Sequence, residues 1–557
     1  LALRENNGNN YIVRHFVLSL LQNSIFKKFH TFDKQKLVAV RQWIVELANK
    51  TVEDDPNYLK EKIAYLWVTI AKKIWGAFLV KSSSNSKDSI VEESATTSEE
   101  IEGWKSMDSD MWALWNASLP GRELALIIVR TLFEDIYLLD DVVASKRTSI
   151  LNQLCVLIVT PDLVLSDIYE PNQMFSDCKM GTEGWFVTWS KYLVEVLREN
   201  SCDSKACDMF VPKILSTFKA CLHWVQPTVL RAENIMSTLF EILTLPNIKL
   251  KILAVDCLHI LFTRNYSNDE DFQFFIGSIF SAQGVRQLAQ FYESIKIDPD
   301  DLDEQLYSLL KKSVEMIVSL SEYLNTSLSN QRNTVSWENS DIDDYLKLVL
   351  TTTQHPSLII SGLSLQMWVS ILRYDDLSSK PPVVRILLDL LEVAANRTIN
   401  FNTTNEDSAT SKFLEADFDS APDSNSFLQN YKKFNEDIVR ITICKKPEYG
   451  LSWLENRLEA FFGSDLGREC ISNSKLDENS DAFNWGNSQF NIIENCIRGI
   501  SRWRIWYTGD DFNTVNDRLN KQVESLGERF LAMSLASPQL IRKQVQTLVQ
   551  FTPLLKD

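Results

Sequence analysis

The chain has 557 residues, with 57 basic and 74 acidic side chains and a formal net charge of −17. This acidic balance argues against a protein whose whole surface coats nucleic acid, and the length exceeds one ordinary core, which leaves several domains or a stacked repeat array. Glycine and proline number only 16 and 15, roughly half of their usual shares of about 7% and 5%. A low content of these turn-forming residues is typical of long helices joined by short links. The composition therefore predicts an all-α protein.

Cysteine usage and the chain ends bear on the cellular compartment. Nine cysteines are scattered without a CxxC pair, and an odd number would leave one unpaired in any disulfide framework. We interpret them as reduced thiols of a cytosolic or nuclear protein. The first ten residues lack a secretory pattern and no run of 18 apolar residues occurs, so we expect a soluble protein without contact to a membrane. Both ends look cut, since the chain opens at Leu1 and closes on an ordinary internal helix.

Apolar residues recur at helical spacing along most of the chain, in runs of about 15 to 20 residues that end at Pro, Asn or Asp. Early runs lie within 37–48, 61–76 and 121–141. Later runs follow Pro246, begin near Leu306, start after His355-Pro356-Ser357 and begin at Pro381-Pro382, where a first helical turn favours proline. The acidic stretch 297–304 is typical of the approach to a helix N-terminus.

Successive runs joined by short polar links predict antiparallel helix pairs. Stacked pairs of this size favour an α-solenoid superhelix of HEAT repeats. Periodicity alone leaves armadillo and tetratricopeptide arrays open, although irregular unit lengths and a missing W-x2-L-G-x2-Y pattern count against the tetratricopeptide type.

Two polar, serine-rich stretches interrupt the helical pattern. We predict a flexible insertion over 81–103 and an acidic, serine-rich loop over 400–426. The predicted organisation is therefore HEAT repeats over 1–80, 104–399 and 427–557, the last group truncated at the end of the chain.

Motifs of catalytic and metal sites are missing from the sequence. It contains no GxGxxG, GxxxxGK[ST], HExxH or GxSxG, and its five histidines are isolated from one another. A lone histidine on an apolar helix, such as His259, is more often a packed or hydrogen-bonded core residue than a ligand or base. We therefore predict no enzyme, no catalytic residue, no metal site and no cofactor.

The segment IRGISRWRIWY at 497–507 interleaves arginines with aromatic residues. Arginine suits bidentate contact with phosphate, and aromatic rings can stack on bases. The same aromatic spacing is more typical of a core, however, and solvated faces explain most other basic points along the chain. The candidate phosphate or cargo contacts are Arg498, Arg502, Arg504, Lys432 and Lys433.

Several segments follow one another in a recognisable order along nearly the whole chain. They are IVRHF from Ile12, EKIAYLWVTIAKKIWG with Lys72, Lys73 and Trp75, GRELALIIVRTLFEDIYLLDD with Arg130, Glu134 and Asp135, QHPSLIISGLSLQMWVSILR with His355, Pro356, Ser357 and Trp368, NEDIVRITICKKPEYGLSWL, and SPQLIRKQVQTLVQFTPLL. In this order they resemble the exportin-5 family of nuclear transport receptors (karyopherins) in the importin-β superfamily. The chain departs from the family at Gly76, where the family usually keeps a proline, and in the insertion that follows.

The resemblance implies a nuclear export receptor. Such receptors bind cargo together with the Ran GTPase in its GTP form, cross the nuclear pore through phenylalanine-glycine (FG) repeats of nucleoporins, and release cargo when Ran hydrolyses GTP. It therefore implies a monomeric receptor that shuttles between nucleus and cytoplasm, binds GTP only through Ran, and is not itself an enzyme. It also places 1–80 close to the Ran-binding region, with the very first repeat missing.

The resemblance divides on cargo, because animal exportin-5 is known for hairpin RNA and the related fungal receptor for phosphorylated proteins. The Asn-rich sequence with its insertion favours the fungal counterpart, so we expect phosphorylated protein cargo. Structured RNA (hairpin or tRNA) is the alternative, and a helical-repeat interaction scaffold without a transport role is a further one. Both cargo classes present phosphates, which basic points within an acidic superhelix can contact.

Overall fold

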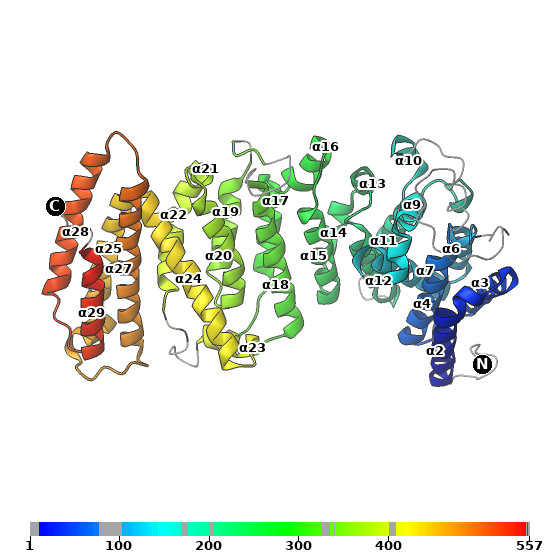
Figure 1. Cartoon of the computed structure of the whole chain (residues 1–557), viewed down its shortest axis with the longest axis horizontal. Coiled ribbons are helices and arrows are strands. Elements are labelled where there is room, and N and C mark those ends of the chain that lie inside the picture. The colour runs from blue at the N-terminus through cyan, green and yellow to red at the C-terminus, as the bar shows by residue number, and fades with distance from the viewer. Residues whose placement is uncertain are drawn as a thin grey trace. The chain divides into compact units, whose positions relative to one another are not determined.

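The computed structural model describes residues 10–76, 103–139, 141–168, 176–199, 205–324, 335–338, 340–399, 401, 408–552 and 554. Within these ranges every regular element is a helix, apart from one isolated bridge between Asp298 and Asp301. The chain divides into two compact units, Leu1–Phe275 and Ile276–Asp557 (Figure 1). The all-α prediction is confirmed, and each unit is a stack of helix pairs that fits HEAT repeats.

Unit 1 stacks its pairs through the second helix of each pair. Helices α2, α4, α7, α12 and α15 contact one another in chain order, and α3, α6, α11 and α14 each pack on the helix that follows them. The helices of unit 1 are α2 (Tyr11–Lys28), α3 (Lys34–Asn49), α4 (Asn57–Ile74), α6 (Met107–Ala117), α7 (Leu119–Phe133), α8 (Val142–Lys146), α9 (Thr148–Val159), α10 (Asp162–Ile168), α11 (Trp185–Glu199), α12 (Lys205–Cys221), α13 (Pro227–Ala232), α14 (Ile235–Leu243), α15 (Ile248–Thr263) and α16 (Asp269–Phe272). Two short 3-10 segments, η1 (Phe29–Thr31) and η4 (Ser176–Cys178), and the π-helical segment η3 (Glu134–Leu138) also belong to unit 1, and a second π-helical segment, η5 (Gln273–Gly277), spans its boundary with unit 2.

Unit 2 follows the same plan, and we call the second helices of its pairs the B row and the first helices the A row. The B row is α18, α20, α24, α27 and α29, and the A row is α17, α19, α22, α25 and α28 (Figure 1). The helices of unit 2 are α17 (Ala282–Ser294), α18 (Glu304–Ser319), α19 (Ile342–Thr353), α20 (Leu358–Arg373), α21 (Asp375–Ser378), α22 (Pro381–Asn396), α23 (Ala409–Asp417), α24 (Ala421–Lys445), α25 (Pro447–Gly463), α26 (Asp465–Ser472), α27 (Asp481–Trp506), α28 (Phe512–Ala532) and α29 (Pro538–Phe551), with the turn η6 (Leu320–Leu324).

Side chains at the predicted helix starts explain where several helices begin. The Ser357 hydroxyl accepts from the backbone N–H of Ile360 and caps α20, and Asp303 at the end of the acidic stretch caps α18 in the same way. Such caps satisfy backbone donors that have no partner inside the helix. Pro381 and Pro382 occupy the first turn of α22, as predicted.

Buried ion pairs link the second helices of unit 1. The Glu123 carboxylate on α7 lies 2.8 Å from Lys60 Nζ on α4 and 2.9 Å from Lys213 Nζ on α12. Its side chain is only 3% exposed. One buried carboxylate therefore holds three successive helix pairs in register, because each charge left alone in this environment would be costly.

Arginines of the A row make the corresponding links in unit 2, at more exposed positions. Arg385 on α22 pairs with Asp343 on α19 at 2.6 Å, and Arg518 on α28 pairs with Glu448 on α25 at 2.5 Å. Between them, Arg457 on α25 lies 2.5 Å from Glu392 on α22. Each neighbouring pair of A-row helices from α19 to α28 is thus joined by one arginine and one carboxylate.

The predicted loop over 400–426 is wrong for residues 408–426, which are largely helical. Ser408 caps α23 and Ser420 caps α24, each accepting from a backbone N–H three residues ahead. Two of the serines that suggested a loop, Ser408 and Ser420, are therefore helix caps, and the apolar residues Phe413 and Leu428 anchor the two helices in the core. Nearly all of the predicted insertion at 81–103 lies outside the described residues.

No helix among the described residues has the length and apolar character that crossing a membrane requires.

Asp108 ties the first turn of α6 to the segment that leads into α11. Its carboxylate accepts from the backbone N–H of Met180 and from Trp185 Nε1, each at 2.6 Å. Burial raises its pKa to about 6, although these two hydrogen bonds oppose the shift. The folded chain therefore holds the proton of the Asp108 carboxyl group more tightly than the unfolded chain does. The stability that protonated Asp108 contributes is complete at pH values below its ordinary pKa near 4, and this stability is lost as the pH rises through 6.

We predict that Asp108→Asn removes this pH dependence. Between pH 5.5 and pH 7.5 the native chain should lose about 1 kcal/mol of local stability relative to the variant, since one pKa unit corresponds to about 1.4 kcal/mol. Hydrogen exchange of the amides in α6 and α11, corrected for intrinsic rates at each pH, measures the difference. Parallel pH profiles for the two proteins would contradict the role given to Asp108.

Candidate functional site

The predicted basic residues lie on α24 and α27, two adjacent B-row helices that run parallel. They approach closely at Gly499, where an added Cβ would lie 2.7 Å from the backbone oxygen of Arg440 and 2.9 Å from Ile443 Cβ. Ser480 and Ser420 cap the two helices. The absence of a side chain at Gly499 therefore lets the two helices, and the charged residues along them, come together.

Lys432 and Arg498 are brought together around half-buried carboxylates. Burial raises the pKa of Glu436 on α24, and the charges of Lys432 and Arg498 oppose that shift. Glu494, one turn before Arg498, lies 3.7 Å from it and 3.1 Å from Lys543 on α29. Much of the positive charge here is thus balanced by carboxylates of the same helices.

Arg502 lies one turn beyond Arg498 and has a different environment. It is exposed, and no carboxylate pairs with it within the described part of the chain. Burial lowers the pKa of Lys445 on α24, and the positive charge of Arg502 adds to that effect. Lys445 is itself paired with Asp375 on α21, so Arg502 is the cation here that has no carboxylate partner among the described residues and can meet an incoming anion.

The two remaining candidates lie apart from these clusters. Arg504 points toward the end of the chain, where it donates to the backbone oxygen of Leu554 at 3.2 Å and to the Asn520 side chain. Burial lowers its pKa, so its guanidinium serves the packing of the last helices. Lys433 is exposed and makes no hydrogen bond or ion pair with the residues that the structure describes.

The aromatic residues of 497–507 divide in the same way. Trp503 is 4% exposed and stacks on Tyr507 and Phe512, with ring centroids 5.0 and 5.4 Å apart, so its expected core role is confirmed. Trp506 is 69% exposed, and for this residue the core expectation is wrong. It ends α27 four residues after Arg502, which places the indole and the free guanidinium on one helix face.

Sequence reasoning missed the partners that decide which charges are free. These partners recur at helical spacing with the predicted residues, and they are Lys445 and Glu436 on α24 and Glu494 on α27. That spacing was visible, but the parallel contact between two helices about 60 residues apart was not, because it depends on tertiary packing.

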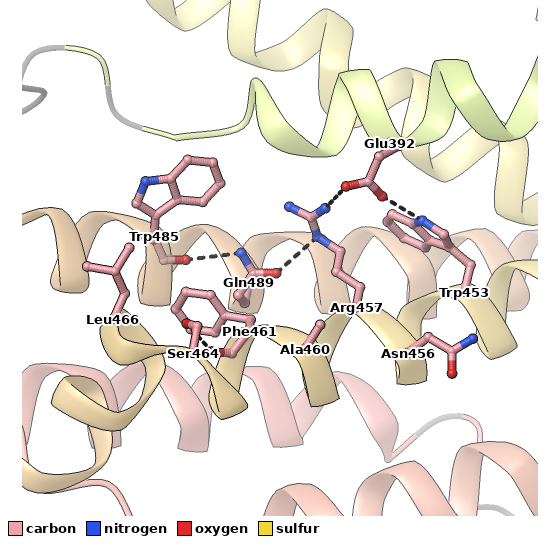
Figure 2. Close-up of a pocket in the computed structure, with 10 residues that line it drawn as sticks. All are labelled: Glu392, Trp453, Asn456, Arg457, Ala460, Phe461, Ser464, Leu466, Trp485 and Gln489. Atoms are coloured by element: carbon pink, nitrogen blue, oxygen red, sulfur yellow. Dashed lines mark hydrogen bonds and ion pairs between the residues drawn. The ribbon is translucent and has the colours of Figure 1, made fainter.

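A pocket of about 550 Å³ lies beside this region, between α22, α25, α26 and α27 (Figure 2). Its polar groups satisfy one another: Arg457 donates to Glu392 at 2.5 Å and to Gln489 Oε1 at 3.1 Å, and Trp453 Nε1 donates to Glu392 at 2.9 Å. The remaining wall includes the half-buried rings of Phe461 and Trp485. Such a lining suits an apolar or aromatic group rather than a charged one.

The residues that carry the family resemblance hold helices together. Lys72 pairs with Asp135 at 2.6 Å and with Asp141 at 2.9 Å. Burial alone would lower its pKa, but these hydrogen bonds outweigh burial and raise it. Arg130 pairs with Glu61 at 2.7 Å, and Trp368 Nε1 donates to Thr353 Oγ1 at 2.9 Å. We find no group of three or more His, Cys, Asp and Glu residues that could hold a metal ion in the described ranges.

The amino-acid sequence of the chain is similar to those of known proteins from one family. The family model described as "Exportin-5 family" matches residues 304–557. Protein MSN5 of Saccharomyces cerevisiae is 35% identical over 553 residues, which cover 99% of this chain and 43% of that protein. The chain is therefore similar to members of the Exportin-5 family along nearly its whole length. Mouse Exportin-5 is 21% identical over 82% of this chain and 35% of its own length.

A further fungal relative supports the same alignment. An uncharacterized protein of Schizosaccharomyces pombe is 29% identical over 98% of this chain and 42% of its own length. The chain therefore spans less than half the length of the curated relatives it matches. Among solved structures, an engineered protein aligns with 99% of this chain at a TM-score of 0.35 and 10% identity, which is too low to bear on the fold.

Proposed function

We propose that this chain is a member of the Exportin-5 family and part of a nuclear export receptor, which binds cargo cooperatively with Ran in its GTP form and acts without catalysis. The observation that carries the proposal is the alignment over 99% of the chain with Protein MSN5, together with the relatives named Exportin-5. A stack of helix pairs suits this task, because small changes at many interfaces alter curvature and let two ligands favour one shape. The receptor would act as a monomer and shuttle between nucleus and cytoplasm.

Phosphorylated proteins are the proposed cargo, and Arg502 is the residue that supports this choice most. Its guanidinium is exposed and has no carboxylate partner among the described residues, whereas the neighbouring Lys445 is paired with Asp375. Arginine binds phosphate through two parallel hydrogen bonds. Lys433 would add positive charge on α24, whereas carboxylates balance Lys432 and Arg498, and the contacts of Arg504 give it a structural role.

Structured RNA is the second candidate cargo, because the exposed Trp506 lies one turn from Arg502. An exposed indole beside a guanidinium is a surface on which an unpaired base can stack. The third candidate is a scaffold without a transport role. For such a scaffold we expect no difference in binding between the GTP form and the GDP form of Ran.

For passage through the nuclear pore we propose contact with FG-repeat nucleoporins. The apolar wall made by Trp453, Phe461 and Trp485 supports this, since it offers a pocket of about 550 Å³ to an aromatic side chain (Figure 2). Its charged residues already pair with one another, so they would not repel a phenylalanine ring.

The transport role predicts a preference for the GTP form of Ran. Immobilised Ran loaded with a non-hydrolysable GTP analogue should retain the full-length protein at least tenfold better than Ran loaded with GDP. Cargo should increase this retention, because coupling between two binding sites is reciprocal. Equal retention on the two forms would sink the transport proposal and leave the scaffold.

The cargo proposal predicts a phosphate-dependent affinity that needs Arg502. A fluorescent phosphoserine peptide should bind more tightly than its unphosphorylated form, and Arg502→Ala should weaken the phosphopeptide about tenfold, since a hydrogen bond to a charged group contributes about 1.5 kcal/mol or more. Fluorescence polarisation at two salt concentrations measures both effects. Arg468→Ala on α26, where the arginine side chain is 68% exposed, is the matched control.

Two results of this titration would count against phosphoprotein cargo. Equal affinity for the two peptides would remove the need for a phosphate. Tighter binding of a short RNA hairpin, lost in Trp506→Ala, would favour the RNA alternative.

A further inference from the structure

Helix α23 (Ala409–Asp417) belongs to neither row of unit 2 but lies on two B-row helices. It contacts α20 and reaches α18 through hydrogen bonds and ring contacts. Among its residues Phe413 is buried as a whole, and the others are exposed or half-buried, with the side chain of Asp417 also buried. A helix that contributes so little to the core is attached to the stack rather than part of it.

Phe413 is the apolar anchor of α23. Its side chain is 1% exposed and packs between Tyr307 of α18, with ring centroids 5.3 Å apart, and His355, at 5.5 Å. Burial lowers the pKa of His355 to about 4, and its Nδ1 accepts from the backbone N–H of Ser357 at 3.0 Å. The histidine is therefore neutral at physiological pH and acts as one wall of a slot for an aromatic ring.

Asp417 is the polar anchor, one turn after Phe413. Its carboxylate accepts from the Tyr307 hydroxyl at 2.8 Å and lies 2.7 Å from Lys311 Nζ, and its side chain is 1% exposed. Burial raises the pKa of Tyr307, so this hydroxyl stays protonated and donates. Residues four apart on a helix share a face, so α23 presents one ring and one carboxylate to the same surface.

The groups that receive α23 have supports of their own. The Ser357 hydroxyl lies 2.6 Å from the Tyr307 hydroxyl and also caps α20. Lys311 Nζ lies 4.0 Å from the centre of the Tyr307 ring. The contact between the Tyr307 and Ser357 hydroxyls ties α18 to α20, and Lys311 packs on Tyr307 within α18. Neither contact involves an atom of α23, so the slot and its positive charge should persist when α23 leaves.

We propose that Tyr307, Lys311, His355 and Ser357 form a peptide-binding site that α23 fills in cis. Its ligand in trans would be a short amphipathic helix of a partner protein that places an aromatic ring and, four residues later, a carboxylate on one face. α23 itself carries this pattern of an aromatic ring followed by a carboxylate. Because α23 is tethered to the site, its effective concentration there is high, and it competes with the partner helix for the site. The site is independent of the proposed transport role.

A peptide with the sequence of residues 408–420, SATSKFLEADFDS, labelled with fluorescein, serves as the probe. The 557-residue chain should bind it weakly, and the variant Phe413→Ala with Asp417→Asn should bind it at least tenfold more tightly, because the tethered competitor is removed. In that background Lys311→Ala should weaken the peptide at least fivefold. Lys312→Ala, a control at the next residue of α18, should leave the affinity within twofold.

Hydrogen exchange of residues 409–417 distinguishes the possible failures. The proposal holds when exchange rises in the double variant and peptide binding rises with it. Faster exchange without a gain in peptide binding would overturn it, because α23 would then be a structural connection only. Unchanged exchange would also overturn it, because Phe413 and Asp417 would not be what holds α23 in place.

Discussion

The structure depends on charges that join successive helix pairs, and Glu123 is the clearest case. Helix pairs of this kind bury apolar faces against their neighbours, but apolar packing alone tolerates sliding along parallel helices. A carboxylate that is 3% exposed and lies between Lys60 and Lys213 removes that freedom across three pairs of unit 1, because a shifted register would leave a buried charge alone. In the A row of unit 2, pairs of an arginine and a carboxylate join neighbouring helices in the same way. These pairs are more exposed, so water weakens their contribution to stability.

This use of charge decides which residues remain for function. Lys72 and Arg130, which carry part of the family resemblance, are each paired within unit 1. Arg502 lacks such a carboxylate in the described residues, although Lys445 beside it is paired with Asp375, and Trp506 extends the same face as Arg502. A net charge of −17 is therefore compatible with a local site for anions, since most basic residues discussed here act inside the stack and few face outward.

Much of the fold could be predicted because it rests on local rules. Helical spacing, prolines in first turns and acidic residues before helices located α18, α20 and α22, and low glycine content indicated long helices. The loop predicted over 400–426 failed because serine at a helix cap and serine in a loop look alike until the neighbouring helix supplies Phe413 with a slot. The site was predicted in part: Arg498 and Arg502 share a face as expected, but the carboxylates that neutralise Lys432 and Arg498, and the contacts that occupy Arg504, come from tertiary packing.

Hydrogen exchange of Glu123→Gln tests most directly whether buried charges hold consecutive pairs together. The account predicts that protection falls in α4, α7 and α12 together, by about 3 kcal/mol, because two lysines lose their partner in one step. Glu61→Gln is the matched comparison, since it breaks a half-exposed link between α4 and α7 and should cost at most about 1 kcal/mol. A loss in Glu123→Gln that stays within α7, or that equals the loss in Glu61→Gln, would contradict the account.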